Sequence, residues 1–152
     1  MADPWIIRDG HRGDVGLIFS SWLKGQRAAM QQVEMDAGYF DAWRLVVAAL
    51  IERSKVVTAV SEDDEERRSR GEKSIIYGWA CGERSVLHAV YVKKPYRRAG
   101  IARALVQGLE LDVLERYVTH APLPKYRQLA ESHGFTYAPH LAAIRALTAG
   151  ER

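Results

Sequence analysis

The chain has 152 residues, of which 47% are hydrophobic and 27% are charged, and its formal net charge is +3. This balance predicts a single globular domain and excludes a disordered or collagen-like chain, and the charge is too mild to indicate nucleic-acid binding on its own. No apolar run approaches the roughly 18 residues of a membrane span, and residues 1–10 lack the features of a signal peptide, so we expect a cytoplasmic protein without membrane contact. The single cysteine, Cys81, excludes an internal disulfide.

The first third of the chain predicts one short strand and two amphipathic helices. Residues 5–7 form an apolar run bounded by turn residues, which is typical of a strand. Apolar side chains at helical spacing predict a helix over about residues 14–32, and these are Val15, Ile18, Phe19 and Trp22. A second helix is predicted where one face carries Phe40, Trp43, Val47, Leu50 and Ile51.

The middle of the chain predicts three strands in a meander. Residues 56–61 are rich in β-branched side chains, and residues 74–81 and 85–92 are two further strand candidates joined by a short turn. Residues 61–73 are polar throughout, acidic first and then basic. We interpret them as a solvated hairpin loop, with an acidic protein-binding segment as the alternative.

The last third predicts a helix over residues 100–114, because Ile101, Leu105, Leu109 and Val113 repeat every four residues. A short strand over residues 117–120 and a helix over about 123–133, closed by Gly134, follow it. Residues 135–139 and 141–147 predict a final hairpin or strand pair, and a polar tail begins at about residue 148. No linker marks a second domain, so residues 1–152 are expected to form one unit.

The most informative segment is residues 90–102, where a strand leads through a basic turn into a helix. The first turn of a helix has backbone N–H groups without partners, and these groups, with the helix dipole, favour an anion. Gly100 and Ala102 lack bulk, so a phosphate can approach the backbone closely. With Arg97 and Arg98 beside it, this turn predicts a phosphate or pyrophosphate site.

The order Arg97-x-x-Gly100-x-Ala102 resembles the Arg/Gln-x-x-Gly-x-Gly/Ala signature of the GCN5-related N-acetyltransferase (GNAT) superfamily, and Gly134-Phe135 is similar to its C-terminal motif. The resemblance implies an α/β (α+β) fold with a mixed, splayed central sheet and helices on both faces. It also implies acetyl-CoA as acyl donor. The backbone of Val90 and Val92 would then pair with the pantetheine arm. The pyrophosphate would bind the N–H groups of Arg98, Ala99, Gly100, Ile101 and Ala102, with Arg97 or Arg98 near the adenosine 3′-phosphate or in solvent.

Transfer to an amine needs a base, because an amine with a pKa of about 10.4 is protonated at neutral pH and only its neutral form is a nucleophile. The resemblance places His88 where many members have a glutamate base, although a half-buried structural histidine is the alternative. Strand alternation puts Tyr91 on the opposite face unless a bulge intervenes. Ala130 stands where the superfamily's acid tyrosine is expected, which leaves Tyr126, one helical turn earlier, as a candidate acid or a packing residue. His120 is a further acid or base candidate.

Cys81 lies in an apolar run and is interpreted as a packing residue rather than a nucleophile, and no metal-ligand spacing is present. The resemblance implies that the acceptor meets the first two helices. Acidic residues there favour a cationic amine or simply complement a helix dipole, and these are Glu34, Asp36 and Asp41. Trp22, Lys24 and Arg27 would instead suit an anionic acceptor. The sequence therefore predicts an acetyl-CoA-dependent N-acetyltransferase, monomer or homodimer, with an unidentified amine acceptor. The alternatives are a catalytically weak acyl-CoA-binding module and a nucleic-acid-directed protein.

Overall fold

The computed structural model describes residues 4–29, 38–112, 116–118, 132, 134–138, 141–142 and 144. The strands are β1 (Trp5–Asp9), β2 (Lys55–Ser61), β3 (Ile76–Glu83), β4 (Val86–Val92), β5 (Arg116–Val118) and β6 (Phe135–Tyr137). The α-helices are α1 (Val15–Ala29), α2 (Tyr39–Arg53), α3 (Asp64–Ser69) and α4 (Ile101–Gly108), with short 3-10 turns η1 (Arg12–Asp14) and η2 (Lys94–Tyr96). His120, Tyr126, Ala130 and most of the helix predicted over residues 123–133 lie outside the described residues.

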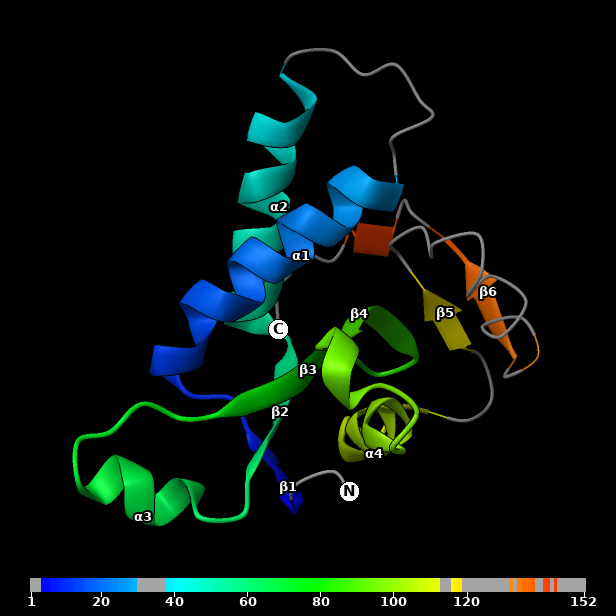
Figure 1. Ribbon diagram of the computed structural model, residues 1–152. Helices are drawn as coiled ribbons and strands as arrows, with labels where there is room; N and C mark the ends of the chain where they lie inside the picture. The colour runs from blue at the N-terminus through cyan, green and yellow to red at the C-terminus, as the bar shows by residue number, and fades with distance from the viewer. Residues whose placement is uncertain are drawn as a thin grey trace.

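One six-stranded sheet in the order β1-β2-β3-β4-β5-β6 organises the chain (Figure 1). Strands β1 to β4 are antiparallel, whereas β5 is parallel to β4 and β6 is parallel to β5. The described parallel pairing of β5 with β4 joins Tyr117 to Val86 and Val118 to Leu87, at the beginning of β4. The expected mixed sheet is therefore confirmed.

Helices cover both faces of this sheet, because its central strands are apolar on both sides. Helix α4 packs on one face through a cluster that includes Val57, Tyr77, Leu87, Val92 and Leu105. Helices α1 and α2 pack on the other face through Ile18, Trp22, Leu50, Trp79 and Cys81 (Figure 1). The predicted α/β class with helices on both faces is confirmed.

The polar segment 61–73 links the antiparallel strands β2 and β3, as a hairpin connection should, but it is not the plain loop that the sequence predicted. It contains α3, whose first residue, Asp64, is 1% exposed although most of its neighbours in the helix are exposed. Asp64 Oδ2 lies 2.8 Å from Arg8 Nε of β1 and 2.9 Å from Arg68 Nε. Burial alone would raise the pKa of Asp64, but hydrogen bonds from Ser74, Arg8 and Arg68 outweigh it and lower the pKa overall. A long-range ion pair thus fixes a helix that has no apolar face.

Two further sequence predictions are corrected near the C-terminal half. Helix α4 ends at Gly108 rather than near Leu114, because Glu110 adopts a left-handed backbone (φ +55°) and Asp112 N then donates to Arg84 O at 2.8 Å. Of the segment predicted as a strand over residues 141–147, the described residues 141, 142 and 144 are helical. An alanine-rich run is a good helix former, and its apolar content alone did not distinguish the two states.

Candidate functional site

The outer edge of β4, defined here as the backbone of Val90 and Val92, faces away from β3. The register pairs Gly78 with Val92 and Ala80 with Val90. One position further along, Lys93 N donates to Tyr77 O at 2.9 Å, which makes Lys93–Tyr77 a hydrogen-bonded pair. Such pairs alternate along an antiparallel ladder, so the N–H and C=O groups of Val90 and Val92 point outward. Val90 is 39% exposed.

A β-bulge in β4 falls at His88. The register passes from Cys81–Ala89 to Gly82–Leu87 and leaves His88 as the extra residue. Leu87 and Val92 consequently pack on the α4 face, while Ala89 and Tyr91 pack on the α1–α2 face. Side chains therefore do not simply alternate between the two faces of the sheet across His88. Because of this bulge, His88 and Tyr91 can share a face.

The His88 side chain is fully buried and sits beside an acidic partner from the neighbouring strand. His88 is 1% exposed, and its Nε2 lies 4.0 Å from Oε1 of Glu83, the last residue of β3. A carboxylate at this separation stabilises the protonated form of an imidazole. Sequence reasoning missed Glu83, because it assigned this residue to the turn between two predicted strands, whereas it ends β3.

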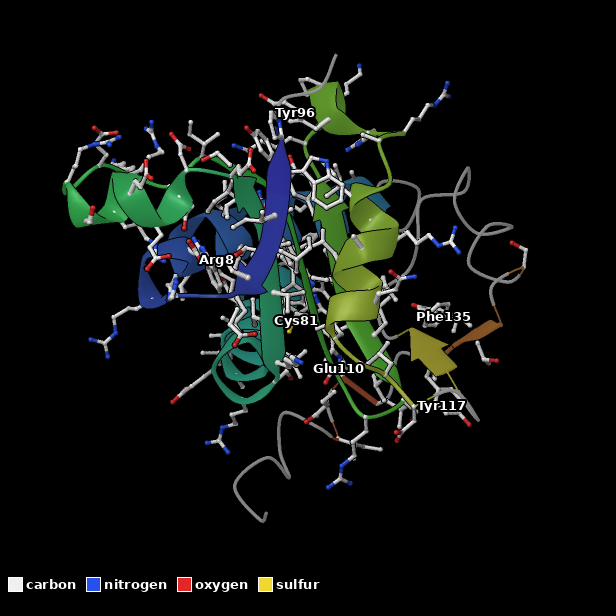
Figure 2. All side chains as sticks on the ribbon, turned by 90° about the horizontal axis from the view of Figure 1, so that it is seen from below. Arg8, Cys81, Tyr96, Glu110, Tyr117 and Phe135 are labelled. Carbon is white, nitrogen blue, oxygen red and sulfur yellow. The ribbon has the colours of Figure 1, made fainter. Side chains whose placement is uncertain are left out.

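The turn after β4 is tied back to the sheet by several contacts. Lys94–Tyr96 forms η2, with Tyr96 N donating to Lys93 O at 2.9 Å. The Tyr96 ring packs on the Tyr77 ring with 4.5 Å between centroids. Arg97 Nε then reaches back to the carbonyl of Val92 at 2.9 Å. Figure 2 shows Tyr96 at the opposite end of α4 from Glu110 and Tyr117, so the turn lies at the N-terminus of that helix.

Two left-handed residues lead from this turn into α4. Arg98 has φ +68° and Gly100, the N-cap, has φ +82°. A left-handed conformation costs a non-glycine residue roughly 1–2 kcal/mol, so its presence at Arg98 is a local strain of the kind that gathers at binding sites. Left-handed residues in such turns orient successive N–H groups toward a common point, which favours an anion.

The surroundings of these N–H groups are exposed and basic. Arg97, Arg98, Ala99, Gly100 and Ala102 are all exposed, and a Cβ built on Gly100 would meet nothing within 4 Å. Lys93, Lys94 and Arg103 lie in the same short stretch of chain. We name residues 97–102 the anion turn. It follows the outer edge of β4 after the short turn η2, and the bond from Arg97 to the Val92 carbonyl ties the two together.

The burial of Cys81 agrees with the sequence prediction for this residue. Cys81 is fully buried, and burial raises the pKa of its thiol to about 12, which confirms a packing role. Within the described ranges, no group of three His, Cys, Asp or Glu side chains is placed to hold a metal ion. In the same part of the chain, no helix is long and apolar enough to cross a membrane.

The region expected to meet an acceptor is described only in part, since Glu34 and Asp36 lie outside the described residues. Trp22 was expected to line this side, but it is 3% exposed and packs 5.4 Å from Trp79, so it belongs to the core. Asp41 is exposed in the first turn of α2. The Arg27 guanidinium lies 4.9 Å from the centre of the Phe40 ring, which joins α1 to α2 by a cation–π contact.

A scan against protein-family models found no match for this chain. A search of curated proteins also found none. Solved structures do match. The aminoglycoside N-acetyltransferase AAC(6')-Iy, in complex with the bisubstrate analogue CoA-S-monomethyl-acetylneamine, superposes with a TM-score of 0.50 and 13% identity over 88% of this chain and 92% of that one.

Two weaker matches have TM-scores of 0.48. One is a GCN5-related N-acetyltransferase structure from Rhodopseudomonas palustris, 14% identical over 97% of this chain and 81% of the other. The other is apo YjaB from Escherichia coli, 17% identical over 70% of this chain and 64% of that one. At these identities the likeness concerns the fold. The architecture of this chain is that of the GCN5-related N-acetyltransferase fold.

Proposed function

We propose that the chain is an acetyl-CoA-dependent N-acetyltransferase that acts on a primary amine. The observation that carries the proposal is the continuity between the outer edge of β4 and the anion turn. An extended amide-containing arm can pair with Val90 and Val92 as an added strand, and a pyrophosphate at its end can accept hydrogen bonds from the N–H groups of residues 98–102. The bisubstrate analogue bound to AAC(6')-Iy is a ligand of this chemical kind.

The reaction would be a direct attack on the thioester. The neutral amine nitrogen forms a bond to the acetyl carbon, the C–S bond breaks, and the amine proton is released to a base while the thiolate takes up a proton. A backbone N–H of the outer edge that the amide-containing arm does not engage would donate to the carbonyl oxygen as negative charge develops on it. The strand fixes this N–H in advance, so no reorganisation is needed when the charge appears.

His88 is the proposed base, and Glu83 would support its protonated form across the 4.0 Å separation. Because the His88 side chain has no exposed surface, the proton would reach it through an ordered water rather than by direct contact with the amine. Tyr126 is the proposed acid for the leaving thiolate, and it lies outside the described residues.

A second candidate is a coenzyme A-binding module without transfer activity. The burial of His88 favours it, since a buried imidazole can equally serve as a packing residue. The cofactor site would be the same in both cases. The two candidates therefore differ only in whether free thiol is released.

Calorimetric titration with coenzyme A, followed by thiol-release assays over amines, peptides and polynucleotides, tests the proposal. We expect binding, and thiol release above the blank with at least one amine. No binding at millimolar coenzyme A would contradict both candidates, and binding without release over the whole panel would contradict transfer.

A backbone substitution makes the binding test specific. Val90→Pro removes one outward N–H and leaves the β3 ladder intact, so coenzyme A affinity should fall roughly tenfold with little loss of stability. Tyr91→Pro is the matched control, because the N–H of Tyr91 belongs to the ladder and its loss should destabilise the fold itself.

A further inference from the structure

We propose that Arg97 is a positioning residue. Its side chain hydrogen-bonds to the last outward carbonyl of β4 and so holds the anion turn against the strand, and this role does not depend on its charge. This inference rests on the proposed function where it concerns coenzyme A, and on the structure alone where it concerns the turn. It assigns to Arg97 a role other than a direct contact with phosphate.

The carbonyl of Val92 is the last outward-facing acceptor of β4. Outward groups follow each other along the strand as the N–H and C=O of Val90 and then those of Val92, because Lys93–Tyr77 is a hydrogen-bonded pair and Gly78–Val92 is not. Arg97 Nε donates to the Val92 carbonyl at 2.9 Å across five residues of chain.

This bond closes the turn between the strand and the helix. The other contacts that hold the turn act on its first part, where Tyr96 N donates to Lys93 O and the Tyr96 ring packs on Tyr77. Among residues 97–102, all of which the structure describes, Arg97 is the one whose side chain hydrogen-bonds to the sheet. The left-handed Arg98 follows directly, so the Arg97 bond sets the position from which residues 98–102 present their N–H groups.

The bond also has a consequence for what the edge can bind. Arg97 already donates to the Val92 carbonyl, so an added extended chain finds its most available partners in the N–H and C=O of Val90 and the N–H of Val92. Strand-like pairing is therefore weakest at the Val92 carbonyl, where the anion turn begins. The arrangement selects a ligand with a short amide-containing arm that leads into an anionic group, rather than a long peptide strand.

Arginine is not the only side chain able to make this bond. The donating Nε follows three side-chain carbons, and the amide nitrogen of glutamine stands the same number of bonds from the backbone. Methionine has a similar length and no donor. Arg97→Gln therefore removes the charge and keeps the donor, whereas Arg97→Met removes both.

The test compares these variants by amide hydrogen exchange without ligand and by calorimetry with coenzyme A at low and high salt. We expect Arg97→Met to exchange faster over residues 93–102 and to bind coenzyme A roughly tenfold more weakly. Arg97→Gln should restore slow exchange and recover affinity to within about threefold of wild type. Arg44→Met, at an exposed position on α2, is the control for loss of an arginine and should leave exchange over residues 93–102 unchanged.

Two outcomes would overturn the inference. If Arg97→Gln and Arg97→Met lose affinity equally, and the loss shrinks as salt is added, Arg97 acts through its charge on the phosphates. If neither variant changes exchange over residues 93–102, the side chain does not hold the turn. Should wild-type protein fail to bind coenzyme A, the proposed function falls, while the exchange comparison still decides the role of Arg97.

Discussion

The left-handed backbone of Gly100 predicts how much stability the protein loses when this glycine is replaced by alanine. It is the N-cap of α4, with φ +82° and ψ 4°. An alanine in this left-handed conformation costs roughly 1–2 kcal/mol relative to glycine. A Cβ at this position would meet nothing within 4 Å, so no steric clash adds to the backbone cost. Gly100→Ala should therefore lower the free energy of unfolding by about 1–2 kcal/mol, and Tm by roughly 2–8 °C for a chain of this size.

Gly25→Ala is a matched control with the opposite expected sign. Gly25 lies inside α1, and its added Cβ would also meet nothing within 4 Å. Alanine is favoured over glycine in a helix interior by about 1 kcal/mol, so this variant should be more stable than wild type. Urea unfolding followed by far-ultraviolet circular dichroism measures both changes.

The same substitution tests the binding site. The Gly100 Cβ would project into the exposed space in front of the anion turn, so Gly100→Ala should weaken coenzyme A binding roughly tenfold or more. A Gly100→Ala variant as stable as wild type, or one that binds coenzyme A normally, would refute the reasoning about this turn.

Three further predictions concern buried groups. Asp64→Ala should lower the free energy of unfolding by about 2–3 kcal/mol at neutral pH, because it leaves Arg8 with one carboxylate fewer. The pKa of Asp64 is lowered in the folded state, so its contribution to the free energy of unfolding is complete above the ordinary carboxyl pKa of about 4 and is lost as pH falls through the lowered value. The stabilities of wild type and variant, measured by urea unfolding, should therefore converge in acid. The Cys81 thiol, with its pKa raised to about 12, should resist a thiol-specific disulfide reagent until the chain is unfolded, and rapid labelling of native protein would contradict its burial. His88→Gln should lower kcat more than it changes the affinity for coenzyme A, and a folded variant that keeps full kcat would remove His88 as the base.

Local sequence patterns were sufficient to predict the central part of the fold. The β-branched and apolar runs located β2, β3 and β4, because these strands are buried on both faces. Helical spacing located α1, α2 and the beginning of α4, since each buries one apolar stripe. The mixed sheet itself followed from the resemblance of the basic turn to a known signature rather than from periodicity.

The features that were missed depend on partners far away in the sequence. Helix α3 forms around Asp64, whose partner Arg8 lies 56 residues earlier. A charged segment carries no periodic signal of such a bond. The early end of α4 depends on Asp112 meeting the backbone of Arg84, which again is a contact between distant residues.

The candidate site shows the same division. Glycine and basic residues in order were enough to predict that a turn leads from β4 into a helix that begins after Gly100. The bulge at His88 and its approach to Glu83 arise from the register between β3 and β4, which the sequence of one strand does not contain. The outward direction of the Val90 and Val92 backbone has the same origin. The sequence left Arg97 either near a phosphate or in solvent, and the bond from its Nε to the Val92 carbonyl could not be predicted from the motif.

Amide hydrogen exchange with and without coenzyme A is the most direct measurement of the central claim, that the outer edge of β4 and the anion turn form one binding site. We predict that coenzyme A slows exchange at the amides of Val90 and Val92 and over residues 98–102, and leaves Tyr91, already bonded to β3, nearly unchanged. Protection elsewhere in the chain with none at these amides, or no protection at saturating coenzyme A, would contradict the account.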